Sequence, residues 1–215
     1  MCRALRSAPA TAKTCWLMIR CLLILGFPCL LWGQNPCLSA EMAEEVRNVA
    51  AFRTQMAAAL HCATNTARQE NGLPPLRKDS SLYQAAQKHS EAMRLGDFFS
   101  HRNRQKQSPA ERIDLAGGNF SATAENIARH SILALPPDGR YLRTDRGLYT
   151  PEGQSIDTLS YRALARAVVA KWLKSPGHRA NILGPYEALG CGVSLIFTST
   201  EGIPELYFTQ NFGRL

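Results

Sequence analysis

Three stretches of the chain carry apolar residues at spacings of three and four, which is the pattern of amphipathic helices. The first runs from residue 39 to about 70 and stops at Gly72, and the second starts at residues 79–80 and stops at Gly96. Small polar residues favour helix starts and glycine favours helix ends, so these boundaries suit helices. The third stretch has its apolar residues at Tyr161, Leu164, Val168 and Trp172. The chain is therefore predicted to contain three main helices.

The end of the chain has the pattern of paired strands. Residues 189–198 and 205–212 are rich in apolar and aromatic residues, and the polar turn 199–204 separates them, so they are predicted to form a hairpin. Residues 129–157 contain two turn sequences and are interpreted as a surface insertion with a small hairpin. A short helix is expected to start at Ser108, with proline just inside. Helices beside a small antiparallel sheet predict an α+β layered domain.

The first 33 residues are interpreted as an export signal. They contain four bases and no acid, and their apolar run covers residues 21–32, which is too short to span a bilayer. An uncleaved anchor is the alternative. Residues 34–51 are then a lead-in helix region and 52–215 the main domain. This predicts a secreted, periplasmic or cell-envelope protein that touches a membrane only through its N-terminal segment.

The charge of the chain does not indicate a nucleic-acid partner. The formal net charge is +8, from 25 basic and 17 acidic residues. Without the four bases of the leader, 21 bases remain against 17 acids, or +4. These bases are spread along the chain, whereas nucleic-acid binding requires a clustered basic surface. We therefore predict that the protein does not bind nucleic acid.

Cysteine usage excludes a disulfide-based scaffold. Once the leader is removed, three of the seven cysteines remain, Cys37, Cys62 and Cys191. An odd number in an oxidising compartment allows at most one bridge and leaves a free thiol. Both Cys37 with Cys62 and Cys62 with Cys191 are open pairings.

Two histidines and one carboxylate are the candidate chemical groups. His101, Glu125 and His178 are 24 and 53 residues apart, so only a fold that converges these segments gives them shared chemistry. Two imidazoles and a carboxylate with an open fourth position are the ligand set of a catalytic zinc ion. The alternative is that Glu125 hydrogen-bonds the histidines and the backbone and stabilises a cleft.

Short motifs in a fixed order cover roughly residues 52–213. They are Asn65 to Arg68, Gly72 to Leu76, Phe99 to His101, Ser108 to Ile113, Glu125 to Ala128, Ser175 to Leu183, Leu189 to Val193 and Gln210 to Gly213. Together they resemble the CAP superfamily, which comprises cysteine-rich secretory proteins, antigen 5 and plant pathogenesis-related proteins. The chain is most similar to the bacterial extracellular branch. The resemblance implies a three-layer α-β-α sandwich with a large central cleft.

The resemblance also implies a site. Family members line the cleft with two histidines and two acids that can hold a divalent ion, zinc or calcium. His101, Glu125 and His178 match three of these positions, whereas Ser175 stands where many relatives have the second acid. The predicted metal set is therefore reduced to three residues, with Glu125 also the candidate catalytic group.

Three further residues are expected to shape the cleft. Asn126 and Asn181 are interpreted as hydrogen-bonding struts. Ser175 is expected to cap the turn before His178, because Pro176 follows it at the first helical position. The predicted function is an exported, non-enzymatic binding module for a lipid, peptide or cell-wall ligand. The alternative is a metal-dependent, protease-like hydrolase.

Overall fold

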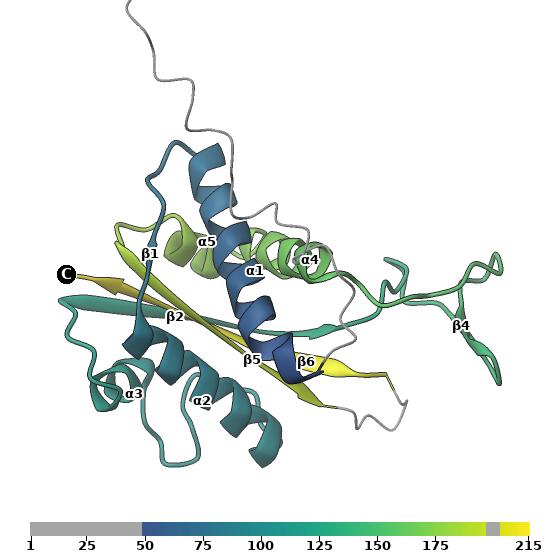
Figure 1. Ribbon diagram of the computed structural model, residues 1–215, viewed down its shortest axis with the longest axis horizontal. Helices are drawn as coiled ribbons and strands as arrows, with labels where there is room; N and C mark the ends of the chain where they lie inside the picture. Colours follow the sequence, from purple (N-terminus) through teal and green to yellow (C-terminus); the bar gives the residue numbers. More distant parts are fainter. Residues whose placement is uncertain (1–48, 197–202) are drawn as a thin grey trace, which may run out of the picture. The chain divides into compact units, whose positions relative to one another are not determined.

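A four-stranded sheet forms the centre of the protein, for which the computed structural model describes residues 49–196 and 203–215. Its strands are β1 (Arg77–Lys78), β2 (Ala122–Ser131), β5 (Ala188–Ile196) and β6 (Glu205–Arg214). They lie in the order β1-β5-β6-β2, and all pairs are antiparallel except β1 with β5 (Figure 1). The pairing of β5 with β6 confirms the predicted hairpin, and β2 is an edge strand that the sequence pattern did not indicate.

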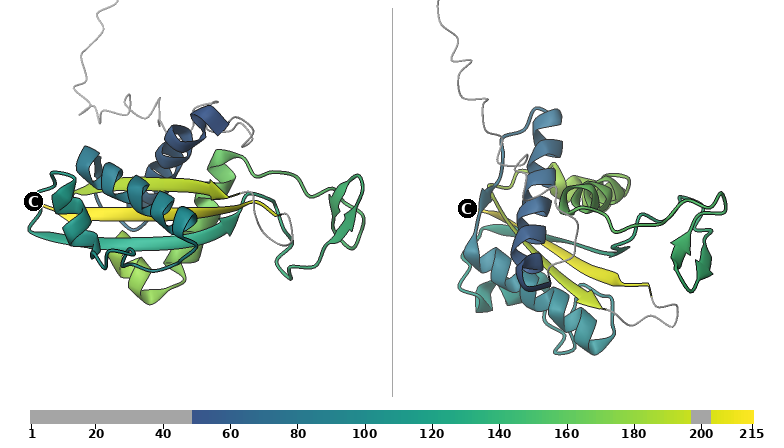
Figure 2. Two further views of the ribbon diagram at one scale, coloured as in Figure 1. Left: turned by 90° about the horizontal axis from the view of Figure 1, so that it is seen from below. Right: turned by 45° about the vertical axis from the view of Figure 1, so that its right-hand side comes forward.

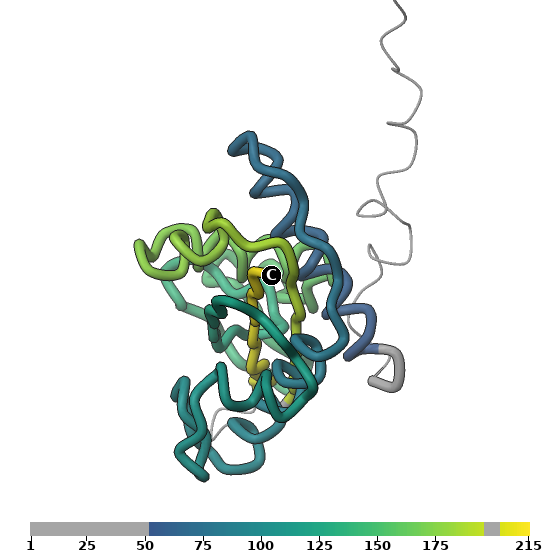
Figure 3. The backbone as a smooth tube through the Cα atoms, turned by 90° about the vertical axis from the view of Figure 1, so that its left-hand side faces the viewer, coloured from purple at the N-terminus to yellow at the C-terminus, as the bar shows by residue number. Residues whose placement is uncertain are grey.

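Helices cover both faces of this sheet. They are α1 (Val49–Glu70), α2 (Ser80–Gly96), α3 (Pro109–Leu115), α4 (Tyr161–Leu173) and α5 (Pro176–Ile182). Helices α1, α4 and α5 pack on one face, and α2 and α3 pack on the other (Figures 2 and 3). The predicted α+β class and its three layers are confirmed.

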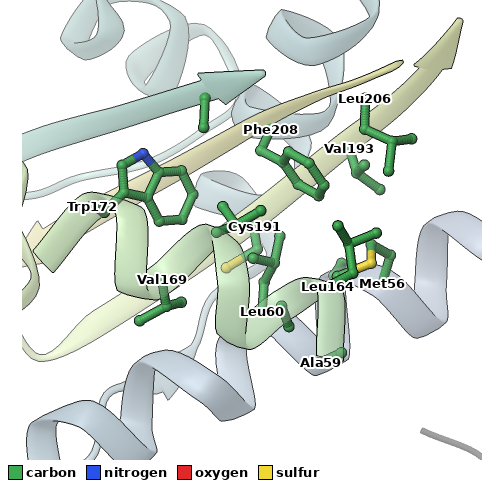
Figure 4. Close-up of a cluster of buried hydrophobic side chains, with 14 of the residues drawn as sticks. Met56, Ala59, Leu60, Leu164, Val169, Trp172, Cys191, Val193, Leu206 and Phe208 are labelled. Carbon is green, nitrogen blue, oxygen red and sulfur yellow. The ribbon is translucent and has the colours of Figure 1, made fainter. Parts of the chain in front are cut away.

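The larger hydrophobic core lies between α1, α4 and the sheet (Figure 4). Met56 and Leu60 from α1 meet Leu164 from α4 and Phe208 from β6, and all four are fully buried. Burying one such side chain contributes about 1.5–3 kcal/mol. Trp172 closes this core, and its indole N–H donates to the backbone oxygen of Ile127 in β2 at 3.0 Å. The spacing that predicted α4 thus reflects its packing on the sheet.

The predicted helix boundaries on the other face are also found. Asp79 caps α2, and its carboxylate accepts from the backbone N–H groups of Ser81 and Leu82 at 3.0 and 3.1 Å. Gly96 is the last residue of α2. Ser108 and Glu111 form a capping box at the start of α3. Helix α2, held in this way, presents His89 toward β2 and the candidate site.

The insertion contains the predicted hairpin but starts later than expected. Strands β3 (Leu142–Thr144) and β4 (Gly147–Tyr149) pair with each other and form a separate two-stranded sheet. This hairpin extends beyond the end of the main sheet (Figures 1 and 2). Residues 129–131 belong to β2, where they pair with β6, so the insertion cannot begin at residue 129.

Some sequence predictions lie outside the described residues. These are the signal or anchor at 1–33, most of the lead-in region, Cys37, and the turn at 199–202. Within the described part, Cys62 is disulfide-bonded and Cys191 is a buried free thiol, so the pairing of Cys62 with Cys191 is wrong. Cys191 packs among core side chains from α1 and α4, where burial raises its pKa to about 12. No described helix has both the length and the apolar character needed to cross a membrane.

His61 on α1 makes stability depend on pH. Burial, together with the charge of Lys78, lowers the pKa of His61 from 6.5 to about 4. The unfolded chain then binds more protons than the native state below pH 6.5, so the free energy of unfolding falls as the pH drops from about 6.5 to 4. Urea unfolding across this window measures the slope. His61→Gln is expected to make it shallower, and an unchanged slope would contradict the assignment.

Candidate functional site

A buried carboxylate, Glu125 on β2, is the centre of the candidate site. Its side chain is 1% exposed. One oxygen accepts from His101 Nδ1 at 2.9 Å, and the other pairs with the Arg112 guanidinium at 2.5 Å. The Asn211 amide, oriented to satisfy both of its hydrogen-bonding groups, donates to the second oxygen at 3.1 Å. His89 Nε2 lies 3.9 Å from the first oxygen. Glu125 is therefore held on both oxygens by protein donors.

The contact with Glu125 fixes the orientation of His101. An ionised carboxylate only accepts hydrogen bonds, so Nδ1 of His101 donates and Nε2 of the neutral ring carries a free lone pair. The His101 side chain is 51% exposed, and Arg112 also donates to its backbone oxygen at 2.8 Å. The site therefore presents an oriented imidazole nitrogen to solvent.

The second histidine is held by two asparagines. Asn126 Nδ2 donates to the backbone oxygen of His178 at 3.2 Å. Asn181 Nδ2 donates to Asn126 Oδ1 at 2.8 Å and to the backbone oxygen of Glu125 at 3.2 Å. These bonds join α5 to the middle of β2. Partial burial, followed by the positive charges of His101 and Lys171, lowers the pKa of His178.

Ser175 does not have the capping role that the sequence suggested. It occupies the N-cap position of α5 and Pro176 follows it, but its side chain makes no capping hydrogen bond. The prediction that its hydroxyl satisfies the first amides of α5 is wrong. The Ser175 side chain instead lines a groove beside His178.

This groove has a cavity volume of about 360 Å³. The loop after α2, the outer edge of β2, α4 and the start of α5 form its walls. Its apolar surface comes from Phe99, Ile127 and Trp172, and its basic side chains are Arg129, Lys171 and Lys174. Among the described residues that line it, none is acidic. The groove thus combines an apolar surface with positive charge.

The structure brings His101 to Glu125 but does not assemble the predicted metal set of His101, Glu125 and His178 into one ready cluster. In the described part of the chain, no three His, Cys, Asp or Glu side chains are placed to hold a metal ion together. Glu125 uses both oxygens for Arg112, Asn211 and His101. The two histidines remain available as metal ligands. The Glu125 carboxylate hydrogen-bonds His101, as carboxylates do to metal-binding histidines in metal proteins. Metal binding by His101, Glu125 and His178 remains a prediction.

Sequence reasoning missed two members of the site, Arg112 and Asn211. Both lie inside motifs that were recognised, the one from Ser108 to Ile113 and the one from Gln210 to Gly213. A buried acid needs a buried partner, so a search for the partner of Glu125 among these motifs could have found the arginine.

Comparison with known proteins agrees with this architecture. Residues 62–212 match the CAP model of the cysteine-rich secretory protein family. The uncharacterized protein YkwD of Bacillus subtilis is 30% identical over 130 residues, which are 60% of this chain and 38% of that protein. The chain therefore spans less than half the length of this curated relative.

Two solved structures share the fold. An extracellular protein with an SCP domain from Bacillus anthracis matches with a TM-score of 0.53 and 22% identity, over 76% of this chain and 42% of the other. An outer surface protein from Borrelia burgdorferi matches with a TM-score of 0.50 and 17% identity, over 80% of this chain and 98% of the other. At these identities the likeness concerns the fold alone.

Proposed function

Because the chain belongs to the CAP family of cysteine-rich secretory proteins, we propose that it is an extracellular binding module whose groove takes an anionic amphiphile. The extracellular placement is supported by the leader-like N-terminus and by the two structural relatives, one extracellular and one on an outer surface. The observation that carries the ligand class is the groove beside His178, with its apolar surface and basic side chains. A fold by itself does not define a ligand, so the proposal rests on this surface.

Charge and shape in the groove favour such a ligand. Phe99 is 48% exposed and lines the groove, so an apolar part of a ligand can cover its ring. Lys174 is exposed and free to meet an anion, whereas Arg129 is already paired with Glu205. A volume of about 360 Å³ falls within the range of about 300–1,000 Å³ that small-molecule sites occupy. A ligand whose acyl chain covers Phe99 and whose phosphate meets Lys171 and Lys174 uses both the apolar surface and the positive charge of the groove.

The role of Glu125 supports binding over hydrolysis. A general base must reach the proton that it removes. The Glu125 carboxylate is buried and engaged by Arg112 and His101, so it acts on His101 and not on a substrate. The hydrolase alternative remains untested, and assays on a panel of peptide and ester substrates address it directly.

The proposed ligand class predicts a charge-dependent affinity. Calorimetry with lauroyl lysophosphatidic acid, below its micelle concentration, is expected to show binding, and lauroyl lysophosphatidylcholine is expected to bind more weakly. Lys171→Gln and Lys174→Gln should each weaken lysophosphatidic acid binding about tenfold, the effect of losing one hydrogen bond to a charged group. Lys88→Gln, an exposed lysine on α2, is the matched control. Equal binding of both lipids would contradict the proposal.

A divalent ion beside the groove is a second proposal, with His101 and His178 as its protein ligands. His101 Nε2 carries the lone pair, and Glu125 orients the ring. In a zinc titration by calorimetry, His101→Ala and His178→Ala are each expected to abolish binding. Glu125→Gln should weaken it about 10–100-fold, as loss of an orienting carboxylate does. His130→Ala is the control, and abolition of binding by Glu125→Gln would restore Glu125 as a ligand.

A further inference from the structure

The outer edge of strand β2 forms part of the groove, and its carbonyl groups are already used. Three successive outward carbonyls accept from helix side chains: Glu125 from Asn181 at 3.2 Å, Ile127 from Trp172 at 3.0 Å and Arg129 from Lys171 at 3.1 Å. In an antiparallel ladder the backbone groups of alternate residues point to the partner strand, so those of Asn126 and Ala128 face β6. In phase with them, the N–H of Ile132 donates to the backbone oxygen of Pro204, just before β6, at 3.3 Å. The backbone of every second residue in β2 therefore points away from the sheet.

The N–H groups of these outward residues remain free. In an antiparallel strand the N–H and C=O of one residue point to the same side. The N–H groups of Ile127 and Arg129 therefore point outward, and both residues line the groove. Among the described residues, none accepts a hydrogen bond from either group. An edge strand normally offers donors and acceptors alternately, but at Ile127 and Arg129 the carbonyls are already engaged and only the N–H groups are free.

We infer that the edge of β2 recognises the ligand, with the N–H groups of Ile127 and Arg129 donating to two acceptor groups of one anionic amphiphile. This inference rests on the proposed function and names the chemistry that the groove selects. Two residues along a strand span about 7 Å, further apart than the oxygens of a single phosphate. A phosphate and the ester carbonyl of an acyl glycerophosphate can meet both donors. The ammonium group of Lys171 lies 3.1 Å from the backbone oxygen of Arg129, so it places positive charge near the Arg129 N–H group.

The same pattern disfavours a peptide added as a further strand. Such a peptide needs acceptors as well as donors from the edge that it joins. The carbonyls of Ile127 and Arg129 already accept from Trp172 and Lys171. A peptide strand would therefore leave its own N–H groups unpaired or displace these side chains, and an unpaired buried donor is costly. A ligand rich in acceptors and poor in donors fits better.

The test removes one N–H group without changing a side chain. The α-hydroxy acid analogue of isoleucine, incorporated at position 127, replaces the amide N–H by an ester oxygen. The dissociation constant for lauroyl lysophosphatidic acid is expected to rise about tenfold or more. The same change at Thr123 is the matched control, because Thr123 also lies at an outward position of β2 but does not line the groove. Thermal unfolding of both ester proteins verifies that each remains folded.

The outcomes separate this inference from the proposed function. Failure of the unmodified protein to bind lauroyl lysophosphatidic acid would overturn both. Normal binding by the unmodified protein with equal binding by the position-127 ester would overturn the inference and leave the proposed function standing. Tight binding of an acidic peptide with amide chemical-shift changes along β2 would also overturn it, in favour of strand addition.

Discussion

Replacing Arg112 with methionine is expected to lower the free energy of unfolding by about 3–5 kcal/mol, the cost of leaving a buried charge without its partner. Arg112 is 7% exposed and Glu125 is 1% exposed in their side chains, so water cannot replace the lost contact. Arg112 also donates to the backbone oxygens of His101 and Gln107, so the loop that carries His101 loses its attachment as well. Urea or thermal unfolding measures the change.

Two variants show whether this loss comes from the unpaired carboxylate. Adding Glu125→Gln to Arg112→Met removes the orphaned charge and is expected to recover part of the stability, which a double-mutant cycle quantifies. Arg140→Gln breaks an exposed ion pair with Asp138 and should change stability by at most about 1 kcal/mol. A loss of less than 1 kcal/mol for Arg112→Met would show that the pair does not hold the site together.

The helices and the last hairpin could be predicted because their signals are local. The spacing from Tyr161 to Trp172 follows the face that α4 turns to the sheet, and Asp79 and Gly96 mark the ends of α2. Strand β2 gave no such signal, because buried polar residues occupy its centre. Counted over the whole residue, backbone included, Glu125 and Asn126 are only 6% and 0% exposed. Their burial depends on Arg112 and Asn181, which are distant in sequence, so no window along the chain could indicate it.

The candidate site was predictable in its members but not in its chemistry. The motifs correctly pointed to His101 and Glu125 as neighbours, since the two are 2.9 Å apart. Whether a carboxylate binds a metal or orients a histidine depends on which donors surround it. That information lies in the positions of Arg112 and Asn211, which only the folded chain brings to Glu125. The free N–H groups of Ile127 and Arg129 could not be predicted from the sequence either, because they depend on how α4 packs against β2.

The glycines on either side of Cys191 are a second case in which only the fold explains a residue. A Cβ at Gly190 would lie 2.1 Å from the backbone nitrogen of Tyr83, and one at Gly192 would lie 2.3 Å from the backbone carbon of Ala86. Both obstacles are backbone atoms of α2, which cannot rotate aside. Glycine at these two positions therefore lets α2 lie directly on β5.

Gly190→Ala and Gly192→Ala are each expected to destabilise the protein by about 3 kcal/mol, the upper end of the cost of overpacking. The double variant should lose more free energy of unfolding than either single variant. Its loss is expected to be a large share of the roughly 5–15 kcal/mol that stabilises a typical domain. Because α2 carries His89 and leads into the loop of His101, its displacement should also weaken lysophosphatidic acid binding.

Gly177→Ala in α5 is the control: nothing lies within 4 Å of its added Cβ, so alanine should raise stability by up to about 1 kcal/mol. Chemical denaturation of the four variants and the unmodified chain measures the expected losses and the expected gain in stability. Equal stability of Gly190→Ala and the unmodified chain would show that α2 moves away from β5 without cost.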